Sequence, residues 1–147
     1  MFSDSTLPPS LIQAYRETYY KAFARPDLAE VAFTLLIDQP CAGLLAAHRS
    51  HRAGCSAFIT ACNPYSKHLT DSENARRQDS LALVLKTRGL FFDAGVGQHP
   101  SNNWEGEPSF LVYGVDLEAA KALGRQFEQN AIVWAGADAV PSLVMLR

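Results

Sequence analysis

The stretch "CSAFITACNPYSKHLTDSE", residues 55–73, contains an apolar segment, a break and the start of a helix. Residues 55–62 are few and rich in apolar and β-branched side chains, which predicts a central strand. Asn63 and the proline after it end this strand. Thr70 and Glu73 form the Thr-x-x-Glu pattern of a capping box, so a helix is expected to begin immediately after Thr70.

The order of elements that follows this stretch indicates the fold class. The sequence predicts a helix to residue 88, two strands, a second helix capped by Asp116 and another strand, over 71–88, 90–96, 109–115, 117–129 and 131–135. Strand, helix, strand, strand, helix, strand is the order of a ferredoxin-like plait, in which both helices cover one face of an antiparallel sheet. We therefore expect an α+β, two-layer sandwich with the βαββαβ plait over residues 55–136.

The flanking segments extend this plait within a single domain, residues 1–147. A short helix is expected after Pro8 and Pro9, and "TYYKAF" is either a strand or a continuation of this helix through Phe23. The strand "EVAFTLLI" and the helix "AGLLAAHRSHR" follow. At the other end, "GADAVP" predicts a hairpin connection to a last strand, "SLVML". The N-terminal strands and the C-terminal hairpin strand are expected to join the same sheet.

Composition excludes several classes of function. The 147 residues are 48% hydrophobic and 19% charged, which predicts a packed core. The net charge of −2 argues against general nucleic-acid binding, which needs a positive excess. No apolar run approaches the roughly 18 residues of a membrane span, and the N-terminus has no signal-peptide pattern. With an odd number of cysteines (Cys41, Cys55 and Cys62), the sequence predicts a cytoplasmic protein without a membrane association.

The first polar cluster lies on the helix that begins after Thr70. At about 100° per residue, Asn74 and Gln78 share a narrow stripe with Leu81 and Leu85, so they are expected to face the sheet. Buried amides need partners. They either tie down the loop at Asn63 or line a cleft together with Thr60 and Ser66. The free N–H groups of the helix start, with Arg77 nearby, would suit an anionic ligand group.

The second cluster follows a long loop, "GQHPSNNWEGEP". Trp104 is either a cover over the core or a stacking surface for a ligand. Glu107 and Ser109 lie where loop becomes strand, and Glu107 is the candidate general acid or base; the alternative is a solvated or capping carboxylate. At the end of the second helix, Asn130 is expected to adopt the left-handed conformation that closes the helix. Gln129 makes a structural hydrogen bond or belongs to the site.

Other motifs do not support a site. His48 and His51 lie one turn apart without a third ligand at a suitable spacing, so no metal is expected. "GVGQ" (95–98) lacks the helix that a dinucleotide fingerprint requires, and no cofactor is expected. No histidine is placed beside Cys62 by any pattern, which argues against a nucleophilic cysteine.

Three segments of the chain, taken in order, resemble the bacterial domain-of-unknown-function 3293 family. They are "FITACNPYSKHLTDSENARRQDSL", "WEGEPSFLVYGVD" and "RQFEQNAIVWAGADAVPSLV". The resemblance covers residues 55–146 and implies no reaction, because the family has no assigned activity. Its motif positions correspond here to Thr60, Asn63, Pro64, Asn74, Trp104, Glu107, Ser109, Phe127 and Gln129. Family members often have glycine where this chain has Glu128.

Two hypotheses of function follow. The first is a cleft for a small polar molecule, anionic or nucleotide-like, with Glu107 as the catalytic candidate; its binding residues are Thr60, Asn63, Ser66, Asn74, Arg77, Gln78, Trp104, Ser109 and Gln129. The second is a non-catalytic interaction module whose sheet or helices bind another protein or a second copy, as in a homodimer. A pocket lined by these side chains would favour the first hypothesis.

Overall fold

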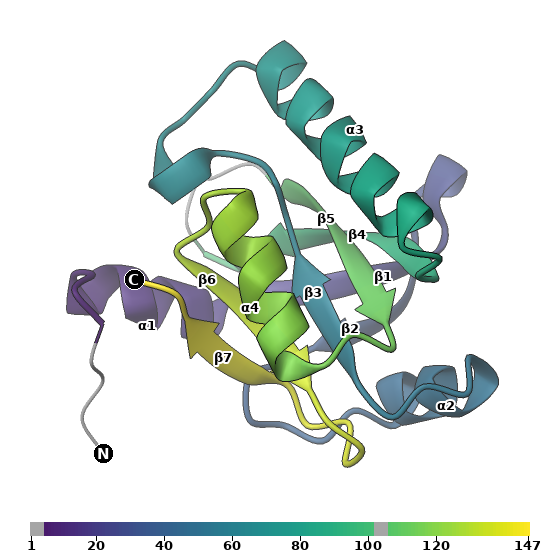
Figure 1. The fold of residues 1–147 in the computed structure, drawn as a ribbon. Helices are drawn as coiled ribbons and strands as arrows, with labels where there is room; N and C mark the ends of the chain where they lie inside the picture. The colour runs from purple at the N-terminus through teal and green to yellow at the C-terminus, as the bar shows by residue number, and fades with distance from the viewer. Residues whose placement is uncertain (1–4, 102–105) are drawn as a thin grey trace.

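The computed structural model describes residues 5–101 and 106–147, and its fold is α+β (Figure 1). The described residues form seven strands in one curled antiparallel sheet, together with four α-helices. The order across the sheet is β2-β1-β4-β5-β3-β6-β7. The strands are β1 Tyr19–Arg25, β2 Glu30–Leu35, β3 Ser56–Ile59, β4 Phe92–Gln98, β5 Glu107–Tyr113, β6 Ala131–Ala135 and β7 Ser142–Met145. The helices are α1 Pro9–Glu17, α2 Ala42–Ser50, α3 Asp71–Thr87 and α4 Leu117–Gln126.

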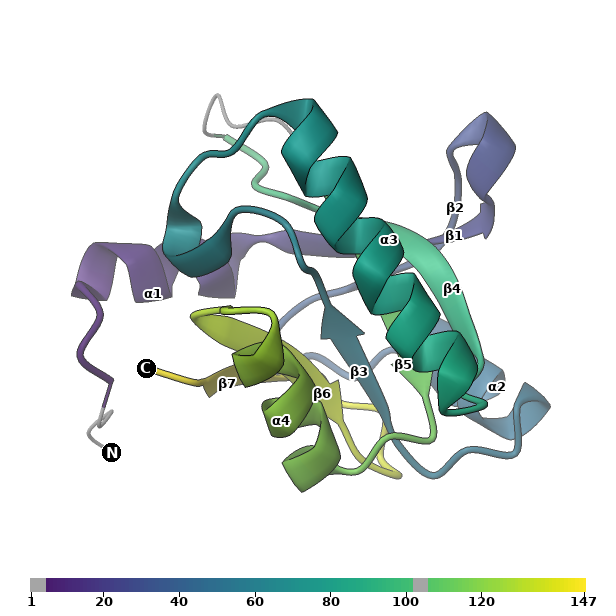
Figure 2. The ribbon, with the colours of Figure 1, turned by 45° about the horizontal axis from the view of Figure 1, so that its top comes forward.

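The two predicted long helices, α3 and α4, lie on the same side of the sheet (Figure 2). The capping box that begins α3 is present, since Thr70 accepts a bond from the Glu73 N–H and the Glu73 side chain accepts one from the Thr70 N–H. Asp116 caps α4 in the same way, by accepting from the Ala119 N–H. Both helices bury apolar side chains against β3, β5 and β6, among them Leu81, Leu85, Leu123, Ile59, Val112 and Ile132.

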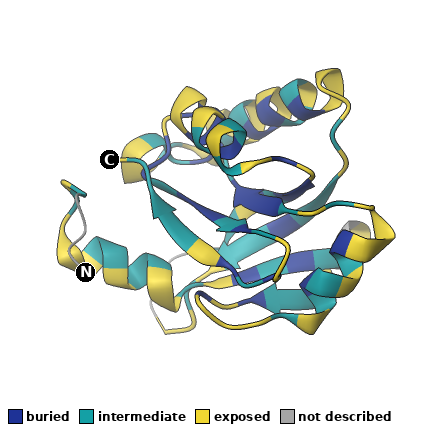
Figure 3. Cartoon of the chain, turned by 60° about the horizontal axis from the view of Figure 1, so that its bottom comes forward, coloured by how far each residue is buried: buried dark blue, intermediate teal, exposed yellow. Residues whose placement is uncertain are grey.

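A second core lies on the opposite face of the sheet, where Leu44 of α2 packs against Phe58, Leu111 and Val133. Buried positions follow the strands between the two helix layers (Figure 3). Helix α1 also belongs to this face but buries none of its residues. It lies across the ends of the strands and leaves space beneath it. None of the described helices is long and apolar enough to cross a membrane.

Three local predictions were wrong. The left-handed residue after α4 is Glu128, with φ of 58°, rather than Asn130. The helix ends earlier than expected, at Gln126, so the turn comes before Gln129. In addition, β5 begins at Glu107 and not at Ser109, because Glu107 pairs with Gly97 of β4. Glu107 is thus held by the sheet.

Candidate functional site

The loop after β3 has an unusual backbone. Three of its non-glycine residues have left-handed conformations: Asn63, Tyr65 and Ser66, with φ of 48°, 51° and 63°. Such conformations cost about 1–2 kcal/mol each and are concentrated at functional sites. The surrounding contacts must therefore stabilise this loop, which carries two of the predicted site residues.

The side-chain amide of Asn63 is the centre of these contacts. Its Oδ1 accepts from the Asn74 Nδ2 at 2.8 Å and from the Leu69 N–H at 3.1 Å. Its Nδ2 donates to the Glu107 Oε2 at 2.9 Å, while its backbone N–H donates to the Asn74 Oδ1 at 2.9 Å. One amide thus connects the loop, α3 and β5, and it brings Asn74 and Glu107 into one hydrogen-bond network.

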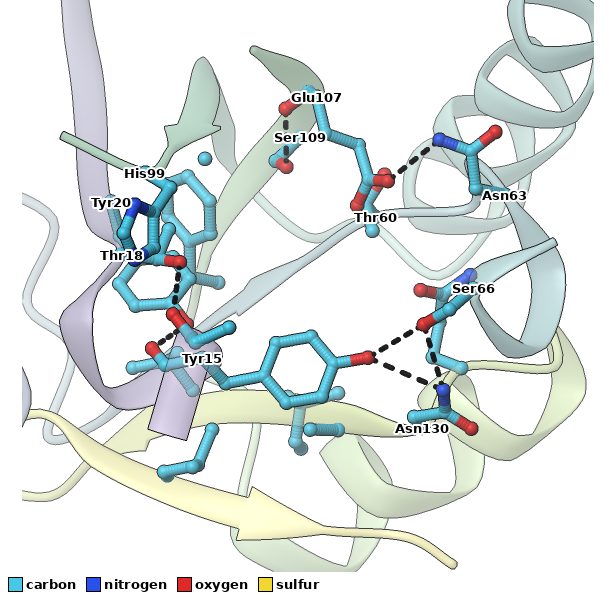
Figure 4. Close-up of a pocket in the computed structure, with 18 of the residues that line it drawn as sticks. Tyr15, Thr18, Tyr20, Thr60, Asn63, Ser66, His99, Glu107, Ser109 and Asn130 are labelled. Carbon is cyan, nitrogen blue, oxygen red and sulfur yellow. Dashed lines mark hydrogen bonds between the residues drawn. The ribbon is translucent and has the colours of Figure 1, made fainter. Parts of the chain in front are cut away.

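A cavity of about 140 Å³ lies beneath α1, at the strand ends beside this loop (Figure 4). Its apolar part comes from Phe58, Val133 and Leu143 among others. Its polar part includes Tyr15, Thr18, Tyr20, Thr60, Asn63, Ser66, His68, His99, Glu107, Ser109, Gln129 and Asn130. Figure 4 shows the Glu107 side chain pointing from its strand toward Thr60 and Asn63.

Strand alternation places these side chains on one face. Glu107 and Ser109 share a face of β5 with the core residue Leu111, because successive side chains point to opposite faces of a sheet. Phe58 and Thr60 are likewise two residues apart, so their side chains also point to one face. The polar residues near the strand ends therefore line the cavity, whereas the apolar residues farther along each strand form the core.

Two glycines of β4, one required by packing and one that lines the cavity, explain the "GVG" motif. A Cβ on Gly95 would lie 2.5 Å from the Lys21 carbonyl oxygen and 2.9 Å from Phe58, so close packing requires glycine there. A Cβ on Gly97 would meet the Tyr20 ring at 3.7 Å and the Thr18 methyl at 3.8 Å, which is ordinary contact. Gly97 lines the cavity, so the absence of a side chain at this position leaves it open.

Glu107 carries the unusual electrostatics of the cavity. Burial raises its pKa to about 6, although the bond from Asn63 acts in the opposite direction. Among the described lining residues Glu107 is the only carboxylate, and none is lysine or arginine. A largely buried carboxylate without a cationic partner is costly. Groups with such shifted pKa values in a cavity are candidates for function.

A hydroxyl and amide cluster closes the cavity on the α1 side. The Tyr15 hydroxyl lies 2.9 Å from the Ser66 Oγ, and the Asn130 Nδ2 donates to both, at 3.2 and 2.9 Å. The Tyr20 hydroxyl donates to the Tyr15 carbonyl at 2.6 Å. These bonds attach α1 to the loop after β3 and to the start of β6.

The predicted residues divide into four groups, of which Arg77 forms the last. Thr60, Asn63, Ser66, Glu107, Ser109 and Gln129 all line the cavity. Asn74 and Gln78 lie on the α3 side of the same network, where the Gln78 Oε1 accepts from the Ala61 N–H at 3.0 Å. Trp104 lies outside the described residues.

Arg77 has a structural role in this arrangement. It donates to the Ala61 and Phe127 carbonyls, both at 2.6 Å, and lies 3.5 Å from the Glu128 carboxylate. The Thr70–Glu73 capping box also occupies free groups at the start of α3. These bonds argue against the anion site expected at this helix end.

Sequence reasoning missed the part of the cavity that comes from distant segments, chiefly Tyr15, Tyr20, His99 and Asn130. Asn130 was interpreted as a helix-closing residue, and it is instead 3% exposed and bonded to Tyr15 and Ser66. One available signal was the strand alternation, which places Ser109 on the face opposite α3. No local pattern indicates that α1 covers this face.

Metal and nucleophile chemistry receive no support from the described residues. Within residues 5–101 and 106–147, no group of three histidine, cysteine, aspartate or glutamate side chains is placed to hold a metal ion. His48 bonds to Ser56 at 2.7 Å, and the His51 ring stacks on Tyr113. Burial raises the pKa of the Cys62 thiol, which disfavours the nucleophilic thiolate.

Comparison with known proteins gives one family. Neither the curated proteins nor the solved structures gave a match. The model of a family described as protein of unknown function (DUF3293) matches residues 59–132, about half of the chain. The matched segment contains the strained loop, the Asn63 network and the Glu107–Ser109 strand start. The chain therefore belongs to the DUF3293 family.

Proposed function

We propose that the cavity beneath α1 binds a small polar molecule with a ring-sized apolar part. The observation that carries this proposal is a cavity with an apolar wall bordered by Glu107, a largely buried carboxylate, and with no lysine or arginine among its described lining residues. Ligand sites are typically apolar cavities with a few convergent polar groups. A cavity of about 150 Å³ is large enough for benzene, so a ligand of about six to ten non-hydrogen atoms fits.

Within this proposal, Glu107 is the group that exchanges a proton with the ligand. A pKa of about 6 is close to neutral pH, where a carboxylate is an effective general base. Thr60 and Ser109 flank it and contribute hydroxyl oxygens. The cavity can bind a ligand whether or not a reaction follows. A Glu107→Gln variant tests only the catalytic role of Glu107.

A fragment screen by ligand-observed NMR tests the binding role, with two variants of Gly97. Gly97→Ala adds a methyl group at ordinary contact distance from Tyr20 and Thr18, so it serves as the matched control. Gly97→Leu extends a larger side chain into the cavity. We expect fragments that bind the wild type to bind Gly97→Ala with similar affinity and to lose at least tenfold in affinity for Gly97→Leu. Fragments that bind all three proteins equally would contradict the proposal.

The alternative, an interaction module or homodimer, is favoured by the outermost strand β2. Leu28, just before β2, and Val31 within it are 60% and 42% exposed, and an exposed strand edge can pair with another chain. Under this alternative the network at Asn63 only fixes loops, and no fragment would depend on Gly97. The same screen therefore separates the two functions.

We also propose that β3, α3, β4, β5, α4 and β6 form a ferredoxin-like plait to which the other strands are added. The order β4-β5-β3-β6, with both helices on one face, supports this assignment. A cytoplasmic location in a bacterium and the lack of general nucleic-acid binding stay predictions from the sequence.

A further inference from the structure

We infer that the ligand of this cavity is a protonated amine whose ammonium group lies against Glu107. This inference rests on the proposed binding function and specifies the charge and the hydrogen-bonding character of the ligand. It follows from which hydrogen-bonding groups on the cavity wall are already engaged by the protein and which are not.

The hydroxyl groups of the wall have mostly used their hydrogens. Four of them donate to backbone carbonyls at distances of 2.6 to 3.0 Å: Thr18, Tyr20, Thr60 and Ser109. A hydroxyl that donates its single hydrogen can offer a ligand only its oxygen lone pairs. In the Tyr15–Ser66 pair one hydroxyl donates to the other, which leaves one hydroxyl hydrogen at that end of the cavity.

The side-chain amides of the wall also donate to protein acceptors. The Gln129 Nε2 donates to the Cys62 and Phe127 carbonyls at 3.1 and 3.0 Å, which leaves its Oε1 as an acceptor. The Asn63 Nδ2 donates to Glu107. Two histidines, His68 and His99, also line the cavity, and the His99 Nε2 lies 3.0 Å from the Glu17 carboxylate. Apart from these imidazoles, the wall around Glu107 presents chiefly acceptors, namely the carboxylate, an amide oxygen and hydroxyl oxygens.

An acceptor-lined cavity with a negative charge is complementary to a cationic donor. An alkylammonium group carries three N–H donors and one positive charge, and charge-assisted bonds to a carboxylate are stronger than neutral ones. Arg147 contacts Asn130 but does not line the cavity, so it does not supply this charge. The Phe58, Val133 and Leu143 side chains are available to the apolar part of the ligand.

Three probes of nearly equal size test the inference: benzylammonium, benzyl alcohol and benzoate, titrated at pH 7 by calorimetry. We expect benzylammonium to bind at least tenfold more tightly than the alcohol and benzoate to bind weakest. Glu107→Gln should lose at least tenfold in affinity for benzylammonium and less than twofold for the alcohol. Glu30→Gln is the matched control, because it makes the same substitution at an exposed residue that lines neither this cavity nor the neighbouring one on the α3 side. This control should leave all three affinities unchanged.

Several outcomes would overturn the inference. Equal affinities for the amine and the alcohol would show that the positive charge of the ligand does not contribute to binding. The proposal that the cavity binds a small molecule would then still stand. If benzoate binds most tightly, the preferred ligand carries a negative charge, which contradicts the inference. If none of the three probes binds while other fragments depend on Gly97, the amine inference alone fails. An empty fragment screen instead overturns the proposed function itself.

Discussion

Asn63 meets two demands that few residue types satisfy together. Its backbone has a φ of 48°, and asparagine tolerates the left-handed conformation better than most side chains. Its amide joins Asn74, Leu69 and Glu107 by bonds of 2.8 to 3.1 Å. The shape of the loop, the position of α3 and the orientation of the Glu107 carboxylate therefore depend on one residue.

Replacement of Asn74 by alanine tests this network through stability. The substitution leaves the Asn63 N–H and one bond of its Oδ1 without a partner, so the free energy of unfolding should fall by about 1–3 kcal/mol. Asp79→Ala, on the exposed side of the same helix, controls for the change in helix propensity. Equal urea denaturation midpoints for the two variants would show that Asn74 contributes no more than a surface residue.

The raised pKa of Glu107 predicts that the stability of the protein falls as pH rises. Its pKa is about 6 in the folded protein and close to 4.5 when unfolded, so the folded state binds more protons between these values. Stability is greatest below about pH 4.5 for this group and falls as pH rises through 6, by about 2 kcal/mol in total. Glu107→Gln cannot titrate, so its stability relative to the wild type should rise by that amount from pH 4.5 to 7.

Urea denaturation of both proteins at several pH values measures this difference. Groups that titrate in both proteins cancel, including His48, whose pKa is lowered by burial and which acts in the opposite direction. A difference that stays constant over the pH range would place Glu107 in contact with water and remove the basis for its role in the cavity.

At the scale of elements, the end of α4 is fixed by contacts from two other segments. The Arg77 side chain of α3 donates to the Phe127 carbonyl, and the Tyr65 N–H donates to the Glu128 carbonyl at 2.7 Å. Glu128 itself adopts φ of 58°. Glycine would suit this position better than glutamate, since glycine has no side-chain penalty in the left-handed conformation.

Glu128→Gly and Glu128→Ala form a matched pair for this turn. Both remove the weak, half-exposed ion pair with Arg77, but only glycine relieves the left-handed strain. We expect the glycine variant to be more stable than the alanine variant by about 1 kcal/mol, as measured by chemical denaturation. An alanine variant of equal or higher stability would indicate that the backbone at this turn is not strained.

At the scale of the whole molecule, the two faces of the sheet differ in how they are packed. The face under α3 and α4 is a continuous apolar core. The opposite face has a core under α2, whereas the part under α1 contains the cavity. Helix α1 buries no residue and is attached chiefly by polar contacts, among them Tyr15 to Ser66 and Glu17 to His99. Polar attachment leaves the space that an apolar helix face would have filled.

The sequence by itself determined the α+β class, the starts of α3 and α4, and the burial of Gln78, Leu81 and Leu85. Caps and periodicities act within a few residues, so they can be interpreted without knowledge of the partners. The prediction that Asn74 and Gln78 face the sheet rested on this local geometry. The same reasoning failed at Glu128 and Asn130, because contacts from Tyr65 and Arg77 set that turn.

Only the tertiary structure decided the composition of the cavity. Tyr15 meets Ser66 from 51 positions away and Asn130 from 115 positions away. It also decided that Arg77 donates to backbone carbonyls, although its place in the sequence suggested an anion site. The burial of Glu107, and therefore its pKa, depends on the curl of a sheet that brings residues of six strands and of α1 around one cavity. These distances in sequence carry no local pattern, because the side chains meet only after the strands have paired.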